Sequence, residues 1–234
     1  EDRKLRDKHF LIIVIEEILK LAKKCYWGMC KNNYFIYLYN GAYWSLLGID
    51  ELKAFLGEAA EKMSLNKFKA RYYSFRNNLY KQFMSSAFLP KPELSKESVF
   101  VNLQNGTFEI TPKGNRLREA SPQDFLTYQL HFEYDPNAIA PIFRAFLDEV
   151  LADKSLQIVL AEYLGYVFIP HSHLKLEKAL LLLGEGSNGK SVIFEIVNAL
   201  LGRENISNYS LQSLTDKDGY YRAKECRSDT VFLI

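Results

Sequence analysis

Eight consecutive residues, Gly184 to Ser191, read GEGSNGKS, so that a glycine, four intervening residues and Gly-Lys-Ser follow one another. This is the spacing of a loop whose backbone N–H groups surround phosphate oxygens. The ammonium of Lys190 can reach the β- and γ-phosphates of a nucleoside triphosphate, and the hydroxyl of Ser191 can ligate magnesium. The pattern therefore predicts a nucleotide-binding protein with ATP and Mg²⁺ as cofactors.

The predicted nucleotide contacts come from this loop and from the residues that follow it. Lys190 and Ser191 are the predicted catalytic residues, and Ser191 is also the predicted magnesium ligand. The other predicted contacts are Gly184, Glu185, Gly186, Ser187, Asn188, Gly189 and Val192. The alternative is a glycine turn between a core strand and a core helix, with Lys190 merely solvated. That alternative does not explain why lysine and serine fall together at the first helical turn.

The segments on either side of the loop have the patterns that such a site requires. Ala179–Leu183 is a short apolar run with the length and bounds of a buried strand. After the loop, apolar residues recur at helical spacing and Gly202 marks the stop; they are Val192, Ile193, Ile196, Val197, Leu200 and Leu201. A helix that begins at Lys190 would direct its N-terminal N–H groups and its dipole toward a bound anion.

The nucleotide-binding unit is expected to be incomplete in this sequence. A polar stretch over residues 203–228 is followed by residues 229–234 (DTVFLI), which are typical of a second core strand. In phosphate-loop enzymes an acid at the far end of such a strand helps to hold magnesium and water. Here that acid would fall after Ile234, and Asp229 is interpreted as a turn residue. We expect phosphate binding without efficient hydrolysis.

Upstream of the loop the sequence alternates between helical and hairpin patterns. Predicted helices cover residues 4–24, 50–63, 64–83, 141–151 and 155–167. Two hairpins are predicted, one over residues 34–47 with a turn at Asn40-Gly41 and one over residues 99–110 with a turn at Asn105-Gly106. Residues 112–122 are predicted to form a loop. The organisation is a mixed module, a helical segment and then the start of an α/β unit.

Composition places the chain among ordinary globular proteins, because 48% of residues are hydrophobic and 25% are charged. The net charge of +2 indicates no particular partner. The apolar run of residues 10–15 is followed by Glu16 and Glu17, which favours an amphipathic helix over a signal or membrane segment. Cys25, Cys30 and Cys226 have no metal-site spacing and suit a reducing compartment, with unpaired thiols favoured over a Cys25–Cys30 bridge.

A second candidate site is a basic, aromatic-rich segment over residues 63–91 that contains no acidic residue. Lys67, Lys69, Arg71 and Arg76 are its candidate nucleic-acid contacts, since cations can follow phosphates while aromatic rings stack on unpaired bases. The alternative, which the helical spacing favours, is an amphipathic helix with its aromatic residues in the core. His171 and His173 are interpreted as a surface connector, and the aromatic residues over 34–44 as hairpin packing.

Several segments together resemble a known family. YFIYLYNGAYW (residues 34–44), VNLQNGTFEI (101–110), QDFLTYQLHFEYDP (123–136), LAEYLGYVFIP (160–170) and the nucleotide loop are similar to the phage/plasmid and poxvirus primase-helicases. Their motor is a superfamily 3 helicase of the AAA+ class, and the likeness is to their C-terminal half. After Tyr221 the pattern departs, with residues 223–227 (AKECR) in place of Gly-Lys and an acid-ended strand, which indicates a truncated or altered C-terminus.

This resemblance implies a fold, a domain plan and partners. The fold class is an α+β N-terminal module with a helical collar, followed by the start of an α/β P-loop (AAA+-like) domain. The module spans residues 1–124, the oligomerisation collar 125–176 and the incomplete ATPase domain 177–234. A hexameric ring would hydrolyse ATP and translocate on single-stranded DNA, coupled to a primase domain or to replication proteins. No membrane partner is expected, and the cytoplasm of a bacterial host or virus-infected cell is the expected location.

Two rival functions remain open from the sequence. One is a non-catalytic DNA-binding or oligomerisation module with residual nucleotide binding. The other is a small-molecule kinase with a phosphate loop, although such kinases usually begin near this loop, which here follows more than 180 residues.

Overall fold

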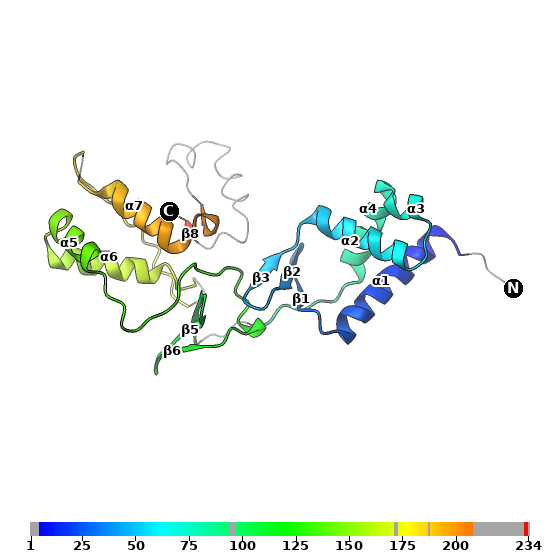
Figure 1. The fold of residues 1–234 in the computed structure, drawn as a ribbon, viewed down its shortest axis with the longest axis horizontal. Coiled ribbons are helices and arrows are strands. Elements are labelled where there is room, and N and C mark those ends of the chain that lie inside the picture. Colours follow the sequence, from blue (N-terminus) through cyan, green and yellow to red (C-terminus); the bar gives the residue numbers. More distant parts are fainter. Residues whose placement is uncertain (1–4, 94–96, 171–172, 187, 208–231, 234) are drawn as a thin grey trace. The chain divides into compact units, whose positions relative to one another are not determined.

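The computed structural model of the chain describes residues 5–93, 97–170, 173–186, 188–207 and 232–233. The described chain divides into two compact units, one up to Glu93 and one from Leu94 onward. Figure 1 shows the elements of both units along the sequence. Both units combine helices with a small antiparallel sheet, which confirms the mixed α+β class. The predicted start of a P-loop domain stays a prediction.

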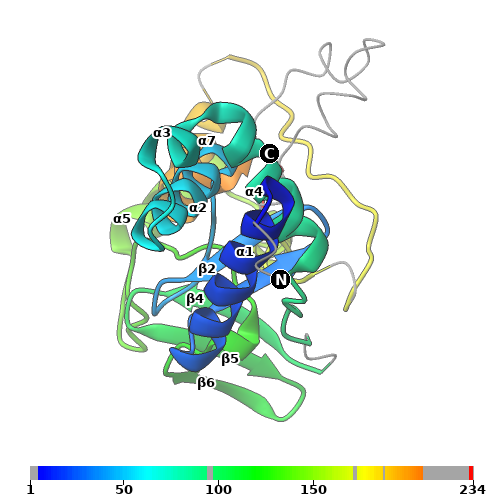
Figure 2. The same cartoon turned by 90° about the vertical axis from the view of Figure 1, so that its right-hand side faces the viewer.

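The first unit is built around helix α1 (Asp7–Lys24), which confirms the first predicted helix. Its buried residues are Val14, Ile15, Ile18 and Ala22, which lie at the three- and four-residue steps of one helix face. This face packs against Ile36 of the sheet and against helices α2 (Ile49–Lys62) and α4 (Tyr73–Ser86) (Figure 2). The core is closed by Leu56, Leu79 and Phe83, each fully buried.

The sheet of the first unit has the strand order β1-β2-β3, with β1 over Met29–Asn32, β2 over Phe35–Tyr39 and β3 over Trp44–Leu46. The predicted β2–β3 hairpin is confirmed, and its register pairs Tyr39 with Trp44. Asn40 holds the turn, because its side-chain oxygen accepts from the N–H groups of Ala42 (3.0 Å) and Tyr43 (2.9 Å). Strand β1 was not predicted.

One predicted helix is broken in two. The sequence indicates a single helix over residues 64–83, whereas the structure has α3 (Lys67–Arg71) and α4 separated at Tyr72. Tyr72 has an extended backbone, with φ −65° and ψ 126°. The break lets Ala70 on one side and Phe75 on the other enter the same core, where Ala70 is fully buried and Phe75 is 6% exposed.

The sheet of the second unit has the order β4-β5-β6, with β4 over Val99–Leu103, β5 over Gly106–Thr111 and β6 over Gly114–Arg118. The second predicted hairpin is confirmed. The prediction of a loop over residues 112–122 is wrong for residues 114–118, because β6 pairs with residues 107–111 of β5. An ion pair then fixes the short 3₁₀ helix η1 (Pro122–Asp124), with Arg118 Nη1 2.9 Å from Asp124 Oδ2. Hydrogen bonding to Asp124 raises the pKa of Arg118 above its ordinary value.

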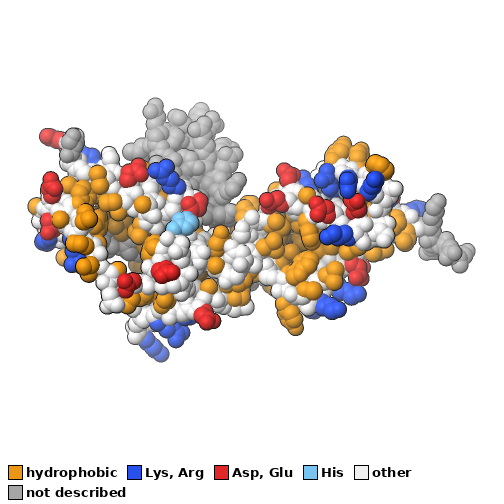
Figure 3. All heavy atoms as spheres, in the orientation of Figure 1, with side chains coloured by type: hydrophobic (Ala, Val, Ile, Leu, Met, Phe, Trp, Pro, Cys, Tyr) orange, Lys and Arg blue, Asp and Glu red, His pale blue; other side chains and the backbone are white. Residues whose placement is uncertain are grey.

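The α-helices in the described part of this unit are α5 (Pro141–Val150), α6 (Lys154–Tyr166) and α7 (Lys190–Leu201). The core consists of Val101, Leu103, Tyr128, Leu130, Leu160, Ile193, Val197 and Leu201. The hairpin that the sequence analysis placed in the N-terminal module thus packs against the helix that follows the glycine-rich loop. Helix α5 has no buried residue, and Figure 3 shows hydrophobic side chains at the surface over α5 and α6.

Short elements end the described part of the second unit. A 3₁₀ helix η2 (Arg203–Asn205) precedes strand β7 (Ile206–Ser207), which pairs in parallel with β8 (Phe232–Leu233). The strand predicted over residues 229–234 is confirmed only at these two residues. Asp229, Cys226 and residues 223–227 lie outside the described residues. Among the helices that the structure describes, none combines the length and the apolar composition that crossing a bilayer requires.

Candidate functional site

The loop with the phosphate-binding pattern leads directly into α7, as predicted. Gly189 is the residue before the helix and has φ +82°, a left-handed conformation that glycine adopts without strain. Its carbonyl accepts from the N–H of Ile193 at 3.0 Å, which starts the helical hydrogen bonding. Ile193, Val197 and Leu201 then anchor the helix in the core of the unit. The loop is therefore attached to a rigid element.

The side chain of Lys190 folds back over the loop from the first turn of α7. Its ammonium donates hydrogen bonds to Gly184 O (2.8 Å), Glu185 O (2.9 Å) and Asn188 Oδ1 (2.6 Å). All three acceptors are uncharged, and none of the ion pairs in the described part of the chain includes Lys190. A full positive charge is thus held at the centre of the loop without a carboxylate beside it.

Two glycines of the loop occupy positions with no room for a side chain. A Cβ added at Gly184 would lie 1.8 Å from Asn188 Nδ2, and one added at Gly189 would lie 2.9 Å from Val150 Cγ1. Gly186 is different, since an added Cβ there would have no neighbour within 4 Å. Gly184 thus faces the ends of the Asn188 and Lys190 side chains within the loop, whereas Gly189 is packed against α5.

The remaining predicted loop residues are accessible. Glu185 and Ser191 are exposed, and Ser191 lies in the first turn of α7 next to Lys190. Val192 is 47% exposed. Ser187 lies outside the described residues. Within the described ranges there is no group of three His, Cys, Asp or Glu side chains that could hold a metal ion, so Ser191 stays a predicted ligand.

The strand predicted before the loop is wrong, because residues 179–183 have no strand conformation in the structure. Leu181 is 74% exposed and Leu183 is 89% exposed. A strand exists through hydrogen bonds to a neighbouring strand. No described segment pairs with residues 179–183, since the parallel pairing of this unit involves only β7 and β8.

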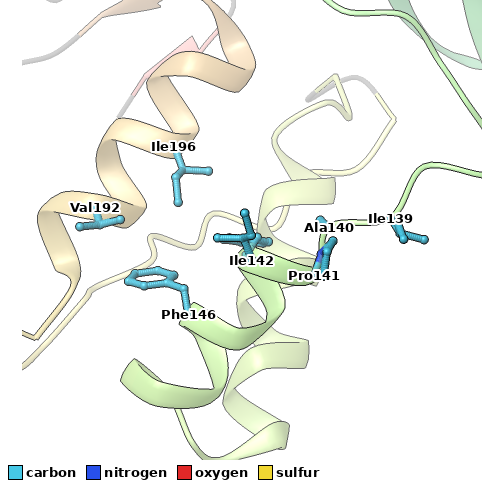
Figure 4. A pocket seen from close by; sticks show the side chains of 8 residues that line it. Ile139, Ala140, Pro141, Ile142, Phe146, Val192 and Ile196 are labelled. Carbon is cyan, nitrogen blue, oxygen red and sulfur yellow. The ribbon is translucent and has the colours of Figure 1, made fainter.

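An apolar pocket of about 520 Å³ lies between α5 and α7, beside the loop. It is lined by Ile139, Ala140, Pro141, Ile142, Phe143, Phe146, Val192 and Ile196. Figure 4 shows Val192 and Ile196 on α7 facing the α5 side chains Ile142 and Phe146. Phe146 also borders the loop, because its Cζ would lie 3.1 Å from a Cβ added at Gly189. Phe146 therefore lines the pocket and also contacts the loop.

Sequence reasoning did not find the contribution of α5 to this site. Phe146 and Val150 lie about forty residues before the loop, and their spacing indicated only an amphipathic helix. The strongest available signal was the apolar face of residues 139–150, which is exposed at Ile139 (79%) and Ile142 (86%) while Phe146 and Leu147 pack against the core. Such a face indicates a function or a partner but does not say which.

The four candidate nucleic-acid cations have different surroundings. Lys67 is exposed, with its ammonium 5.2 Å from the centre of the Phe68 ring. Arg71 forms two hydrogen bonds with the Glu61 carboxylate, at 2.9 Å and 3.0 Å. Lys69 pairs with Asp7 and lies 4.7 Å from the Phe10 ring. Arg76 is half-buried, and its Cδ would lie 2.8 Å from a Cβ added at Gly57. Lys69 and Arg76 thus have structural contacts within the first unit.

The aromatic residues of the same segment fall into a buried group and an exposed group. Phe75 and Phe83 are in the core, as the amphipathic-helix alternative predicts. Phe68, Tyr72 and Tyr73 are not, since they are 76%, 57% and 66% exposed. The prediction that the aromatic hairpin over residues 34–44 serves packing is confirmed for Tyr37 and Trp44, which are buried.

Comparison with known proteins bears on both units. A family model described as "D5 N terminal like" matches residues 16–152, which is more than half of the 234-residue chain. The matched range extends from α1 through α5 and ends before the glycine-rich loop. No curated protein matches the chain.

Proposed function

The chain belongs to the D5 N-terminal-like family, the N-terminal domain of D5-like primase-helicases, and from this premise we propose that it is the ATP-binding part of a replicative DNA helicase. Family membership gives the chain a replication-related role. The proposal adds that the parent protein hydrolyses ATP in a hexameric ring, translocates on single-stranded DNA and serves a phage, plasmid or other mobile element.

The observation that carries the proposal is the uncompensated charge of Lys190 inside the loop. A buried or half-buried ammonium is usually paired with a carboxylate, yet this one meets only two carbonyls and an amide oxygen. Three phosphate oxygens with two or more negative charges would replace these weak acceptors with strong ones. The N-terminus of α7, with its free N–H groups and positive dipole end, would stabilise the same anion.

The residues present fit Mg-ATP. In the proposal Lys190 binds the β- and γ-phosphates, Ser191 ligates the magnesium, and the backbone N–H groups of Gly186 to Gly189 bind the phosphate chain. Bound Mg-ATP would supply a phosphoanhydride whose hydrolysis is strongly favourable. The chain's own contribution is to hold the phosphates at the start of α7, where Gly189 leads into the helix and the first N–H groups face the anion.

We also propose that the pocket between α5 and α7 takes the base of the nucleotide. Its lining is apolar, and Val192 belongs both to the pocket and to the first turn of the helix that starts at Lys190. A planar base buries most of its surface against such side chains, and a base next to the phosphate loop would cover the exposed Ile139 and Ile142.

The proposed phosphate site is tested by titrating the full chain with Mg-ATP in a calorimeter. Lys190→Ala removes a charge-assisted contact worth about 1.5–3 kcal/mol, so we expect an affinity about 10- to 150-fold weaker. Lys178→Ala, an exposed lysine before the loop, is the matched control and should bind as the unaltered chain does. Equal affinity of Lys190→Ala and the control would refute the phosphate site.

The proposed base site needs a different comparison, between ATP and inorganic triphosphate. Ile142 is 86% exposed, so Ile142→Ser should leave the fold intact while it removes apolar surface from the pocket. We expect roughly 3- to 10-fold weaker ATP binding and unchanged triphosphate binding. Ile110→Ser, on strand β5, is the control. Parallel losses for both ligands would contradict a base site.

Turnover distinguishes the helicase from a non-catalytic module. ATP hydrolysis that increases on addition of single-stranded DNA is expected for the helicase in its full-length parent. Nucleotide binding without any turnover in that parent would favour the non-catalytic alternative.

A further inference from the structure

Three exposed aromatic side chains lie around the break between α3 and α4. Phe68 is on the outer side of α3, Tyr72 is at the break and Tyr73 starts α4. Their exposed fractions are 76%, 57% and 66%. The rings of Tyr72 and Tyr73 are in edge contact, with centroids 5.0 Å apart and planes at 64°. We call Lys67, Phe68, Arg71, Tyr72 and Tyr73 the α3–α4 surface.

The break itself is what turns these rings outward. Asn66 caps α3 by accepting from the N–H groups of Phe68 (3.0 Å) and Lys69 (3.3 Å), which sets where the short helix begins. Tyr72 then leaves the helical conformation, and α4 restarts with Phe75, Leu79 and Phe83 directed into the core. The core of this unit is complete without the three outer rings. Their exposure therefore has no explanation in the stability of the fold.

The charge around these rings is positive. No acidic residue occurs between Ser64 and Pro92. Carboxylates from elsewhere also reach the segment: Asp7 pairs with Lys69, Glu61 pairs with Arg71, and the charge of Glu58 acts on Arg71 as well. Hydrogen bonding from Arg71 lowers the pKa of Glu61, so this pair stays ionised at neutral pH. Lys67 is used by none of the ion pairs found in the described ranges. Figure 3 shows Lys and Arg side chains beside hydrophobic ones over α3 and α4, with Asp and Glu side chains next to them.

From this arrangement we infer that the α3–α4 surface binds single-stranded nucleic acid, with unpaired bases stacked on Phe68, Tyr72 and Tyr73 and a phosphate on Lys67. Exposed rings match the faces of unpaired bases, which a duplex keeps inside its stack. An acidic peptide would use the cation but not three rings. The inference rests on the proposed function for the identity of the strand, and it lies in a different compact unit from the nucleotide loop.

The surroundings of the cations also indicate which of them can bind a phosphate. Lys67 is exposed and lies over the Phe68 ring, with only a charge interaction with Glu61, whereas Lys69 is committed to Asp7 and to the rings of Phe10 and Phe75. Arg71 is 69% exposed at its side chain and keeps donors beyond those used by Glu61. Affinity should therefore depend on Lys67 and the three rings more than on Lys69 or Arg76.

The test measures binding of a fluorescent 20-nucleotide oligo-dT to the full chain by anisotropy, over a range of salt concentrations. Phe68→Ala, Tyr72→Ala and Tyr73→Ala should each weaken binding roughly 5-fold or more, as loss of base stacking predicts. Tyr72→Phe should bind normally because it keeps the ring. Lys67→Gln should reduce the salt slope by about 0.7. The matched control is Phe88→Ala, since Phe88 is 88% exposed in the same unit but lies after α4.

Several outcomes would overturn the inference. Oligo-dT affinity equal to that of the unaltered chain in all three ring variants would do so. Equal affinity for an abasic strand of the same length would show that only charge is recognised. Loss of binding to anionic vesicles, but not to oligo-dT, in the ring variants would assign the surface to a membrane. Fluorescence of Trp27 and Trp44, both in this unit, verifies that each variant is folded.

Failure here is distinguishable from failure of the proposed nucleotide site. The ring variants should bind Mg-ATP normally, whereas Lys190→Ala should bind oligo-dT normally in the absence of nucleotide. A chain that binds DNA but not ATP would be consistent with the inference about the α3–α4 surface and would refute only the assignment of the loop.

Discussion

The close packing of Gly189 gives the sharpest prediction about the loop. Gly189→Ala places a Cβ at a position with φ +82°, 2.9 Å from Val150 Cγ1 and 3.1 Å from Phe146 Cζ. A left-handed conformation costs an L-residue about 1–2 kcal/mol. Val150 and Phe146 are only half-buried and can shift, so overpacking against them adds about 1 kcal/mol, the low end of the usual range. Both effects destabilise the second unit.

A change in the unfolded state opposes the strain and the overpacking. Replacing glycine by alanine restricts the unfolded chain, which stabilises a protein by about 0.4–1 kcal/mol where the conformation is compatible. Because strain and overpacking exceed this gain, we expect Gly189→Ala to lower the free energy of unfolding of the second unit by about 1–3 kcal/mol. Gly186→Ala is the matched control, since apart from its chain neighbours no described residue comes within 4 Å of its added Cβ.

The assay is denaturant unfolding followed by two probes. The only tryptophans of the chain, Trp27 and Trp44, lie in the first unit, so their fluorescence follows that unit alone. Far-ultraviolet circular dichroism also follows α5, α6 and α7. The dichroism transition should move to lower denaturant for Gly189→Ala while the tryptophan transition stays in place. In the double variant Gly189→Ala/Val150→Ala the contact is relieved but the backbone strain remains. The stability that Gly189→Ala removes from Val150→Ala should therefore be smaller than the stability it removes from the unaltered chain, but not zero.

If Gly189→Ala and Gly186→Ala have the same stability and the same affinity for Mg-ATP, then the conformation of the loop does not require glycine at its junction with α7.

Two further predictions concern buried groups. Asn102 is fully buried, and its side chain donates a hydrogen bond to the carbonyl of Tyr128 at 2.8 Å. Asn102→Ala should therefore lower the free energy of unfolding of the second unit by about 1–3 kcal/mol, measured by dichroism. A loss no larger than that of the exposed Asn115→Ala would contradict this prediction. Burial raises the pKa of the Cys30 thiol to about 11, so its reactive thiolate is absent at pH 8 and is recovered only as pH rises toward that value or when the unit unfolds. Iodoacetamide at pH 8 should therefore modify exposed Cys25 but not Cys30 until denaturant is added, as peptide masses will show; equal modification of both in the folded chain would be inconsistent with the buried thiol.

Local patterns predicted the elements whose cause is local. The helix over α1 follows from apolar residues at helical spacing, and the hairpin turn follows from Asn40-Gly41, whose side-chain oxygen and backbone freedom suit it. The start of α7 at Lys190 follows in the same way from a glycine before a periodic apolar run. In each case the residues that decide the conformation are neighbours in the sequence.

Three elements were mispredicted because their cause is distant. The helix break at Tyr72 depends on which side chains the core of α1 and α2 accepts. Strand β6 is polar and half-exposed, so only its pairing with β5 reveals it. The apolar run 179–183 has the composition of a strand but forms none, because hydrogen bonds to a neighbour make a strand and no described segment supplies them.

The sequence by itself determined the chemistry available at the candidate sites: glycines, one lysine and one serine in a phosphate-binding order, and cations interleaved with aromatic rings. Only the tertiary structure decided which of these groups are accessible and what stands beside them. It brings Phe146 and Val150 of α5 against Gly189, and it buries Phe75 and Phe83 while it leaves Phe68, Tyr72 and Tyr73 in water. The reason is that burial depends on contacts between residues far apart in the sequence, which spacing along one segment does not specify.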